Sequence, residues 1–142
     1  AIGEIFDIDE TAFKVAAGFS GGIADEAKGT CGAFTGCIIV LGYFFGRDFK
    51  NITMSGSKFK CRELTRGLRR KFHETYGGEN CWQVQKSVFG GKYYNMGDPA
   101  EKVLFEEAGA HKDKCTSVVG NAAKWLAKIL LDEGIAIKCP QK

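Results

Sequence analysis

The stretch Gly29-Thr30-Cys31-Gly32-Ala33-Phe34-Thr35-Gly36-Cys37 joins a glycine-rich loop to an apolar run that continues to Phe45. Thr30 can cap a helix that begins at Cys31, and Gly46 can end it. This helix is apolar on nearly every side, which is typical of a helix enclosed by its neighbours. We therefore expect it to be the central helix of the fold, covered all round.

The segments on both sides of this helix also have helical patterns. The expected helices are opened by a capping residue or closed by glycine: Asp9 to Ser20-Gly21-Gly22, Ser57 to Tyr76, Asn80 to Val88, Asp98-Pro99 to Gly109, and Asp113 to the residue before Gly134. In the fourth of these, Glu101 can complete a capping box with Asp98. The best strand candidate, Ile135 to Cys139, is short. The sequence therefore predicts a single all-α domain over residues 1–142, a bundle of about five to six helices.

Spacings of three and four residues identify the faces that these helices bury. The helix from Ser57 has the stripe Cys61, Leu64, Leu68 and Phe72, and the last helix has the stripe Cys115, Val118, Val119, Ala122, Leu126, Ile129 and Leu130. At the start of the chain, Ala1, Ile2, Ile5 and Phe6 fit one face of a helix already under way. We therefore expect residues upstream of Ala1 to be missing, through processing, truncation or disorder.

The composition limits the classes of function. The chain has 142 residues, 44% of them hydrophobic and 26% charged, and a net charge of +3, which is too small to indicate a nucleic-acid partner. No stretch of about eighteen apolar residues is present, so no membrane span is expected. Six cysteines are too few for a disulfide-built miniprotein of this length and favour a reducing, cytoplasmic setting. A disulfide reading remains as the minor alternative.

Three cysteines lie where helices are expected to begin: Cys31, Cys81 and Cys115. The first turn of a helix has amides without internal partners and the positive end of the helix dipole, so a thiolate there is stabilised and its pKa falls. Such ends, pointing inward, could hold an anionic iron–sulfur cluster through N–H···S contacts. Cys37 and Cys61 are expected in the core, and Cys139 to be incidental.

The motifs that are absent exclude several chemistries. No histidine follows a Cys-x-x-Cys pair, so c-type haem attachment is excluded. No nucleotide-binding motif, zinc-protease motif or Cys-x-x-Cys dithiol is present either. His73 and His111 lie among charged residues and are expected on the surface. The basic segment Arg66 to Lys71 predicts a solvated face, or a docking site for an acidic partner.

Cys31-Gly32-Ala33-Phe34-Thr35-Gly36 resembles the Cys-Gly-Ala-x-x-Gly signature of the C-GCAxxG-C-C family of redox-active proteins. Gly18-Phe19-Ser20-Gly21-Gly22, the stretch from Phe72 to Cys81, and Cys115 agree with this resemblance, which covers nearly the whole chain. The family has four characteristic cysteines, the first of them upstream of the region that matches Ala1. A similar domain occurs in a dimeric c-type cytochrome, so the resemblance also implies electron transfer and a homodimer, without the haem.

The leading interpretation is an electron carrier rather than a catalyst, with a redox protein as its partner. Cys31, Cys81 and Cys115 would supply thiolates to an iron–sulfur cluster, with zinc as the alternative metal and a fourth ligand from the missing segment or another chain. A second interpretation is a thiol–disulfide or persulfide oxidoreductase with Cys31 as the nucleophile. A third is a non-catalytic binding module that docks an acidic partner through the face from Arg66 to Lys71.

Overall fold

The computed structural model describes residues 2–51 and 56–138. Within these ranges the chain forms seven α-helices, short 3-10 and π-helical segments, and no β-strand beyond isolated bridges. The all-α prediction is confirmed. The helix that raises the number above six is α1 (Ile2–Ile5), a single turn at the start of the chain.

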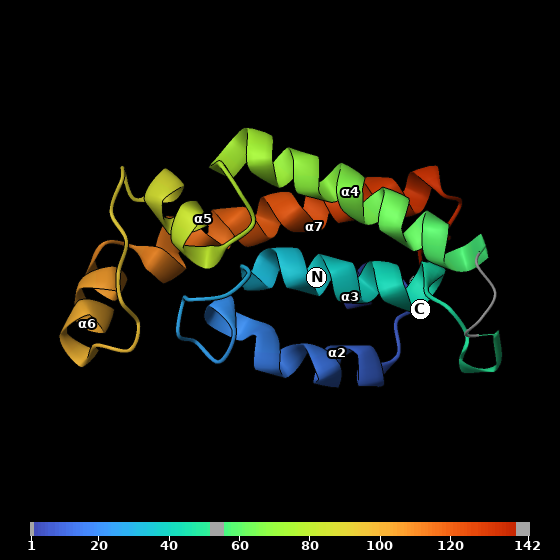
Figure 1. Ribbon diagram of the computed structural model, residues 1–142, viewed down its shortest axis with the longest axis horizontal. Coiled ribbons are helices and arrows are strands. Elements are labelled where there is room, and N and C mark those ends of the chain that lie inside the picture. Colours follow the sequence, from blue (N-terminus) through green and yellow to red (C-terminus); the bar gives the residue numbers. More distant parts are fainter. Residues whose placement is uncertain (1, 52–55, 139–142) are drawn as a thin grey trace.

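Four helices lie side by side and form the body of the molecule (Figure 1). They are α2 (Glu10–Ala16), α3 (Gly32–Phe45), α4 (Gly56–Tyr76) and α7 (Cys115–Asp132), and α3 contacts each of the other three. The shorter helices α5 (Cys81–Val88) and α6 (Pro99–Glu107) lie beyond the end at which α3 begins. The prediction that this helix is the central one is confirmed, because α3 contacts all three of the other helices of the body.

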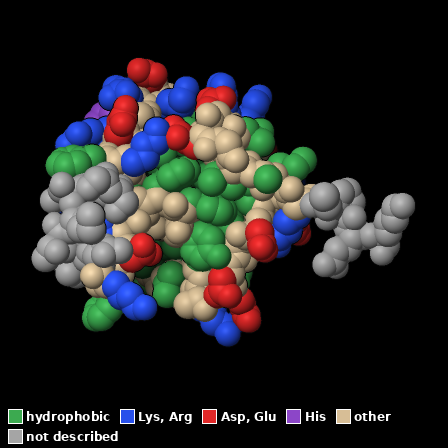
Figure 2. Space-filling model, turned by 90° about the vertical axis from the view of Figure 1, so that its right-hand side faces the viewer, with side chains coloured by type: hydrophobic (Ala, Val, Ile, Leu, Met, Phe, Trp, Pro, Cys, Tyr) green, Lys and Arg blue, Asp and Glu red, His purple; other side chains and the backbone are tan. Residues whose placement is uncertain are grey.

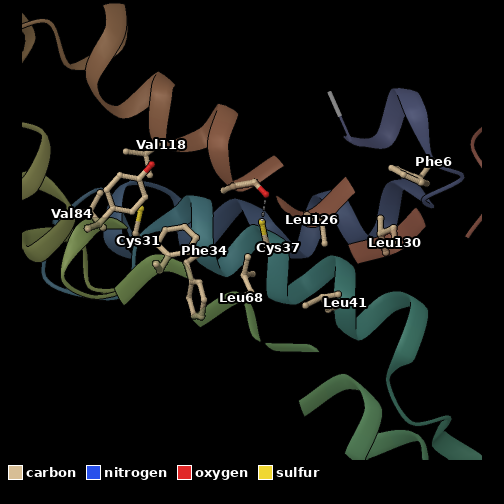
Figure 3. Packing of buried hydrophobic residues seen from close by; sticks show 13 residues of the cluster. Phe6, Cys31, Phe34, Cys37, Leu41, Leu68, Val84, Val118, Leu126 and Leu130 are labelled. Carbon is tan, nitrogen blue, oxygen red and sulfur yellow. Dashed lines mark hydrogen bonds between the residues drawn. The ribbon is translucent and has the colours of Figure 1, made fainter. Parts of the chain in front are cut away.

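The expectation that α3 is covered all round is wrong. Phe34, Cys37 and Leu41 are its fully buried residues, and they project into the core toward α4 and α7 (Figure 3). Tyr43, near the end of the helix, is 47% exposed. The end view of the bundle, where α3 ends and α4 begins, shows hydrophobic side chains gathered in the middle of the face (Figure 2). An all-round apolar helix is thus only partly enclosed by the described residues.

The helix starts differ from prediction in two details. The N-cap of α3 is Cys31 and not Thr30, because Thr30 is used in a β-bridge to Asn80. Asp98 does cap α6, but the Glu101 carboxylate accepts a hydrogen bond from the Asn95 amide at 2.6 Å, so no capping box forms. The cap of α5 at Asn80 is confirmed, and Gln83 makes it a full capping box.

The last described residues, Ile137 and Lys138, pair with residues near the start of the chain. Instead of the suggested strand from Ile135, the structure has an isolated bridge between Phe6 and Ile137, next to a hydrogen bond of 2.7 Å from the Lys138 amide to the Ile5 carbonyl. Phe6 is fully buried by this arrangement. Cys139 lies outside the described residues.

Two separate hydrophobic clusters hold the helices together. The large one joins α3, α4, α5 and α7, and includes Leu68, Phe72, Leu126 and Leu130. The small one consists of Tyr94, Phe105 and Ala110 and lies between α6 and the start of α7. Val119, predicted in the buried stripe of the last helix, is 54% exposed. Cys31 belongs to the large cluster, and Cys115 packs against the small one.

Candidate functional site: a cavity lined by cysteines

Cys31 and Cys81 are brought together by pairing of the two loops that precede their helices. Thr30 and Asn80 form an antiparallel bridge, in which the Cys31 amide donates to the Glu79 carbonyl at 2.8 Å. The Cys81 amide donates to the Gly29 carbonyl at 2.9 Å. Both cysteines therefore leave one short backbone ladder directly into a helix, Cys31 as the N-cap of α3 and Cys81 as the first residue of α5.

The register of this bridge sets the spacing of the two thiols. Glu79 lies opposite Cys31, so Cys81 is the diagonal neighbour of Cys31. Diagonal neighbours in an antiparallel ladder lie on the same face, about 7–8 Å apart. The register therefore places the two thiols on the same side of the bridge, and both are free in the structure.

The 3-10 segment η1 (Ala17–Gly22) packs closely against these helix starts. A Cβ atom at Gly22 would lie 2.6 Å from the Cβ of Cys81, and the φ of Gly22 is +77°. A Cβ atom at Gly32 would lie 3.1 Å from the Phe19 carbonyl oxygen. Gly22 therefore combines a positive φ with a close approach of its backbone to Cys81.

Cys115 reaches the site in a different way from the one predicted. A π-helical turn, Ala110–Lys114, runs directly into α7, and the Cys115 amide donates to the Ala110 carbonyl within it. Cys115 is therefore the first α-helical residue of α7 but does not lie at a free helix end. The argument from unpaired amides and the helix dipole is wrong for this cysteine.

A single cavity of about 800 Å³ contacts all three cysteines. It extends from the paired loops along the space between α3 and α7. Its lining includes Cys31, Cys37, Cys81 and Cys115, apolar residues of α3 and α7 such as Gly36, Val118 and Ala122, and a group from the α6 side made of Met96, Lys102, Phe105, Glu106 and His111. Three remote stretches of sequence thus contribute thiols to one cavity.

Cys37 and Gly36 also line the cavity, in addition to the three predicted site cysteines. Cys37 is buried in the core as expected, and its thiol donates to the Ala122 carbonyl at 3.6 Å, but it also lines the cavity. Gly36 also lines the cavity, and a Cβ atom there would meet nothing within 4 Å, so no neighbouring helix crosses closely at this residue. Gly36 therefore faces open space in the cavity. Cys61 is half-buried on α4 and does not line the cavity.

Gln85 is a site residue that the sequence analysis missed. It is the buried polar residue among the described side chains, 2% exposed. The side-chain carbonyl oxygen of Gln85 accepts a hydrogen bond from the Tyr94 backbone amide at 2.9 Å. This bond fixes the orientation of the side-chain amide, whose Nε2 lies 3.9 Å from the Cys81 sulfur. The signal in the sequence is that Gln85 follows Cys81 by four residues, which places both on one face of the helix.

The thiols hold their protons more tightly than free cysteine does. Burial raises the pKa of Cys81 to about 12, with the nearby Cys31 and Cys115 adding to the effect. Burial and Cys31 likewise raise the pKa of Cys115 to about 11. For Cys31, burial outweighs the opposing amides of Ala33 and Phe34, so its pKa is also raised. The expectation of lowered thiol pKa values at helix starts is therefore wrong, because desolvation is the larger effect here.

Glu79 ties the paired loops to α4. Its carboxylate accepts from Arg69 at 2.7 Å and lies 2.6 Å from the Nε2 of His73. Burial alone would raise the pKa of Glu79, but these hydrogen bonds hold it below its usual value. Arg66, Arg69, Arg70 and His73 also line a separate shallow hollow of about 420 Å³, outside the thiol cavity. His73 is exposed, as expected.

His111 lies on the surface but at the edge of the cavity. Its side chain is 69% exposed, and its Nδ1 lies 2.8 Å from the Glu106 carboxylate. The ring also packs edge-on against Phe105, with 6.0 Å between ring centres. The surface prediction for His111 is confirmed, but its position on the cavity was not foreseen.

The described donor groups form no site for a single metal ion. Over residues 2–51 and 56–138, no three side chains of histidine, cysteine, aspartate or glutamate converge on a point where one ion could be held. A mononuclear zinc site needs its sulfur donors about 2.3 Å from one centre. A polynuclear iron–sulfur group spreads its cysteine ligands around its own width, which suits three thiols on the walls of one cavity.

The fold and the cavity define a small all-α protein in which four cysteines, Cys31, Cys37, Cys81 and Cys115, line one cavity. None of the described helices combines the length and the hydropathy that crossing a bilayer requires. A family model described as "Putative redox-active protein (C_GCAxxG_C_C)" matches residues 1–129. The chain therefore belongs to the C_GCAxxG_C_C family, and the assignment made from the sequence is confirmed. No curated protein and no solved structure matches the chain.

Proposed function

We propose that this redox-active protein is an electron carrier that binds an iron–sulfur cluster in the thiol-lined cavity through Cys31, Cys81 and Cys115. The observation that supports this most directly is the shared lining: three cysteines from three remote segments meet at one cavity of about 800 Å³. Bound there, the cluster would accept one electron from a donor protein and release it to an acceptor protein.

The chain's own groups would bind the cluster and tune it. Each thiol would lose its proton on binding, because thiolate is the form that ligates iron. The amides of Ala33 and Phe34 already favour a negative charge on the Cys31 sulfur. Gln85 Nε2, 3.9 Å from the Cys81 sulfur, could donate to that sulfur in the same way. Such N–H···S contacts stabilise the more negative, reduced state.

The raised thiol pKa values are compatible with this role. Buried thiols without a cationic partner are poor nucleophiles near neutral pH. Cys81 and Cys115, with pKa values of about 12 and 11, would be slow to attack a disulfide or persulfide. A metal supplies the positive charge that ionises them. The raised pKa values therefore favour the cluster over the thiol–disulfide oxidoreductase.

The test is iron and acid-labile sulfide analysis, with visible and electron paramagnetic resonance spectra, on full-length protein purified without oxygen. We expect stoichiometric iron and sulfide, a visible chromophore, and a paramagnetic signal in one of the two redox states. Cys31→Ala, Cys81→Ala and Cys115→Ala should each lose most of the iron and the chromophore. A colourless protein that contains neither iron nor sulfide would contradict the proposal.

Cys61→Ala provides the matched control, because Cys61 is a free thiol that does not line the cavity. It should retain the iron and the spectrum of the native protein. Zinc in place of iron, with no chromophore, would support a structural metal site and exclude electron transfer. A change of two thiols per chain on mild oxidation, with no metal, would support the oxidoreductase.

A further inference from the structure

The three cysteines supply three thiolates, and the α6 side of the cavity, where Cys115 also packs, offers further donors. The polar groups here are Lys102, Glu106 and His111. Lysine at neutral pH is protonated and has no lone pair to offer a metal. The imidazole is the softer of the two remaining donors and the one that iron–sulfur centres use in place of thiolate.

His111 is held in the way that a metal-binding histidine is held. Its Nδ1 lies 2.8 Å from a Glu106 carboxylate oxygen. If Nδ1 carries the proton and donates it to this carboxylate, the lone pair remains on Nε2, at the other side of the ring. Carboxylate contacts of this kind fix the tautomer and orientation of metal-ligating imidazoles and increase their basicity.

The backbone also places His111 beside a cysteine of the site. His111 and Cys115 are four residues apart, about one helical turn, so they lie on the same side of the helical segment. The segment between them is a π-helical turn in which the Cys115 amide bonds to the Ala110 carbonyl. Such turns are rare and often occur at functional sites, where the extra residue redirects side chains. Here the turn places both side chains at the same cavity.

Cys37 is the competing donor within the chain. It lines the cavity, but its thiol already donates to the Ala122 carbonyl, and only 4% of the residue is exposed. Ligation by Cys37 would break that hydrogen bond and place charge within the main hydrophobic cluster. His111 would bind as a neutral ring at the solvent-facing edge, with no such cost.

We propose that His111, oriented by Glu106, is the nitrogen ligand of the metal cluster, completing a set of three cysteines and one histidine. This inference rests on the proposed function, since it concerns the same cluster. In this arrangement the Nε2 lone pair binds an iron atom, and Nδ1–H donates to Glu106. Glu106 acts as a positioning residue and does not touch the metal.

The experiment measures histidine nitrogen coupling in the paramagnetic state of the full-length protein, using electron spin-echo or double-resonance spectroscopy. Protein with ¹⁴N histidine is compared with protein in which histidine alone is labelled with ¹⁵N. The sequence has two histidines. We expect a strong directly bonded nitrogen coupling that changes with the label, persists in His73→Ala and disappears in His111→Ala. His73 is a matched control, because it also contacts a glutamate but lies outside the cavity.

Two further variants separate ligation from simple packing. His111→Cys should keep a cluster, lose the nitrogen coupling and have a lower reduction potential, since replacing cysteine by histidine raises the potential of such centres. Glu106→Gln should keep the coupling but shift the potential, because the imidazole loses its anionic partner. Cys37→Ala should keep the nitrogen coupling, because Cys37 is not a ligand in this arrangement.

The outcomes distinguish this inference from the proposed function. Stoichiometric iron and sulfide with no histidine coupling, or a coupling that survives in His111→Ala, would overturn the assignment of His111 and leave the electron-carrier proposal standing. Loss of the cluster in Cys37→Ala, with an unchanged signal in His111→Ala, would identify Cys37 as the ligand instead. Absence of iron and sulfide from the native protein would overturn both.

Discussion

The cavity cysteines show how two local effects compete at a single atom. The start of a helix favours a thiolate, and the amides of Ala33 and Phe34 do act in this direction on Cys31. Removal of water from the sulfur acts in the opposite direction and is stronger, so the pKa is raised. A thiol in this environment is stable as a neutral group until a cation enters the cavity.

The raised thiol pKa values predict that the metal-free protein loses stability at alkaline pH. Unfolded cysteines ionise near a pKa of about 8.5, whereas folded Cys81 and Cys115 keep their protons to about 12 and 11. Above pH of about 8.5 the unfolded state therefore binds fewer protons than the folded state, and the free energy of unfolding falls as pH rises. Denaturant unfolding of reduced, metal-free protein between pH 7 and 10.5 measures this.

The lysines also titrate in this range, so a variant is needed to isolate the thiols. Cys81→Ala removes one of the raised groups, and its free energy of unfolding should fall less steeply with pH than that of the native protein. Parallel pH profiles for the two proteins would show that the Cys81 thiol has an ordinary pKa.

Gly22 is a glycine whose backbone packs directly against the side chain of Cys81. Its φ is +77°, and a Cβ atom would lie 2.6 Å from the Cβ of Cys81. We expect Gly22→Ala to lower the free energy of unfolding by about 2–4 kcal/mol, from backbone strain and overpacking together. It should also reduce the amount of metal bound, because Cys81 must move.

Gly18→Ala is the control for this prediction, since it lies in the same 3-10 segment and a Cβ atom there meets nothing within 4 Å. Its stability should stay within about 0.5 kcal/mol of the native value. Equal effects of the two substitutions would contradict the proposed contact with Cys81. Urea unfolding and metal analysis are the measurements.

At the level of the elements, the site depends on how α5 begins. Asn80 caps this helix, takes part in the capping box with Gln83, and pairs through its backbone with Thr30. Glu79, the residue before it, is bound by Arg69 of α4. The start of an eight-residue helix is thereby attached to both α3 and α4.

Asn80→Ala should therefore lower the free energy of unfolding by about 1 kcal/mol through loss of the cap. Because the start of α5 would open more often, alkylation of Cys81 by iodoacetamide in the metal-free protein should accelerate more than that of Cys61. Asp98→Ala, which removes the cap of α6, should cost a similar amount but leave the Cys81 rate unchanged. Equal acceleration of Cys81 in both variants would indicate global opening instead.

At the scale of the whole molecule, the cavity lies between two hydrophobic clusters of unequal size. Cys31 and Cys37 belong to the large cluster, and Cys115 packs against the small one formed by Tyr94, Phe105 and Ala110. Small clusters bury less apolar surface and open at lower free energy. The α6 side of the site is therefore expected to be the more mobile wall.

Truncation of one residue in each cluster tests this arrangement. Phe105→Ala should cost about 3–5 kcal/mol locally and should accelerate alkylation of Cys115 more than that of Cys31 in the metal-free protein. Leu126→Ala, in the large cluster, should accelerate both thiols to the same extent because it destabilises the whole bundle. Mass spectrometry of the alkylated peptides gives the separate rates, and equal acceleration in Phe105→Ala would show a single cooperative unit.

The helices, most of their ends and the family could be predicted from the amino-acid sequence, because they depend on local caps, on spacing and on short motifs such as Cys31 to Gly36. The way in which the thiols meet could not be predicted, because it depends on contacts between remote segments. The Thr30–Asn80 bridge joins segments fifty residues apart, and no local pattern encodes its register. The π-helical turn at Ala110 and the desolvation that raises the thiol pKa values likewise arise from packing between elements, which is why the predicted helix-dipole effect at Cys115 failed.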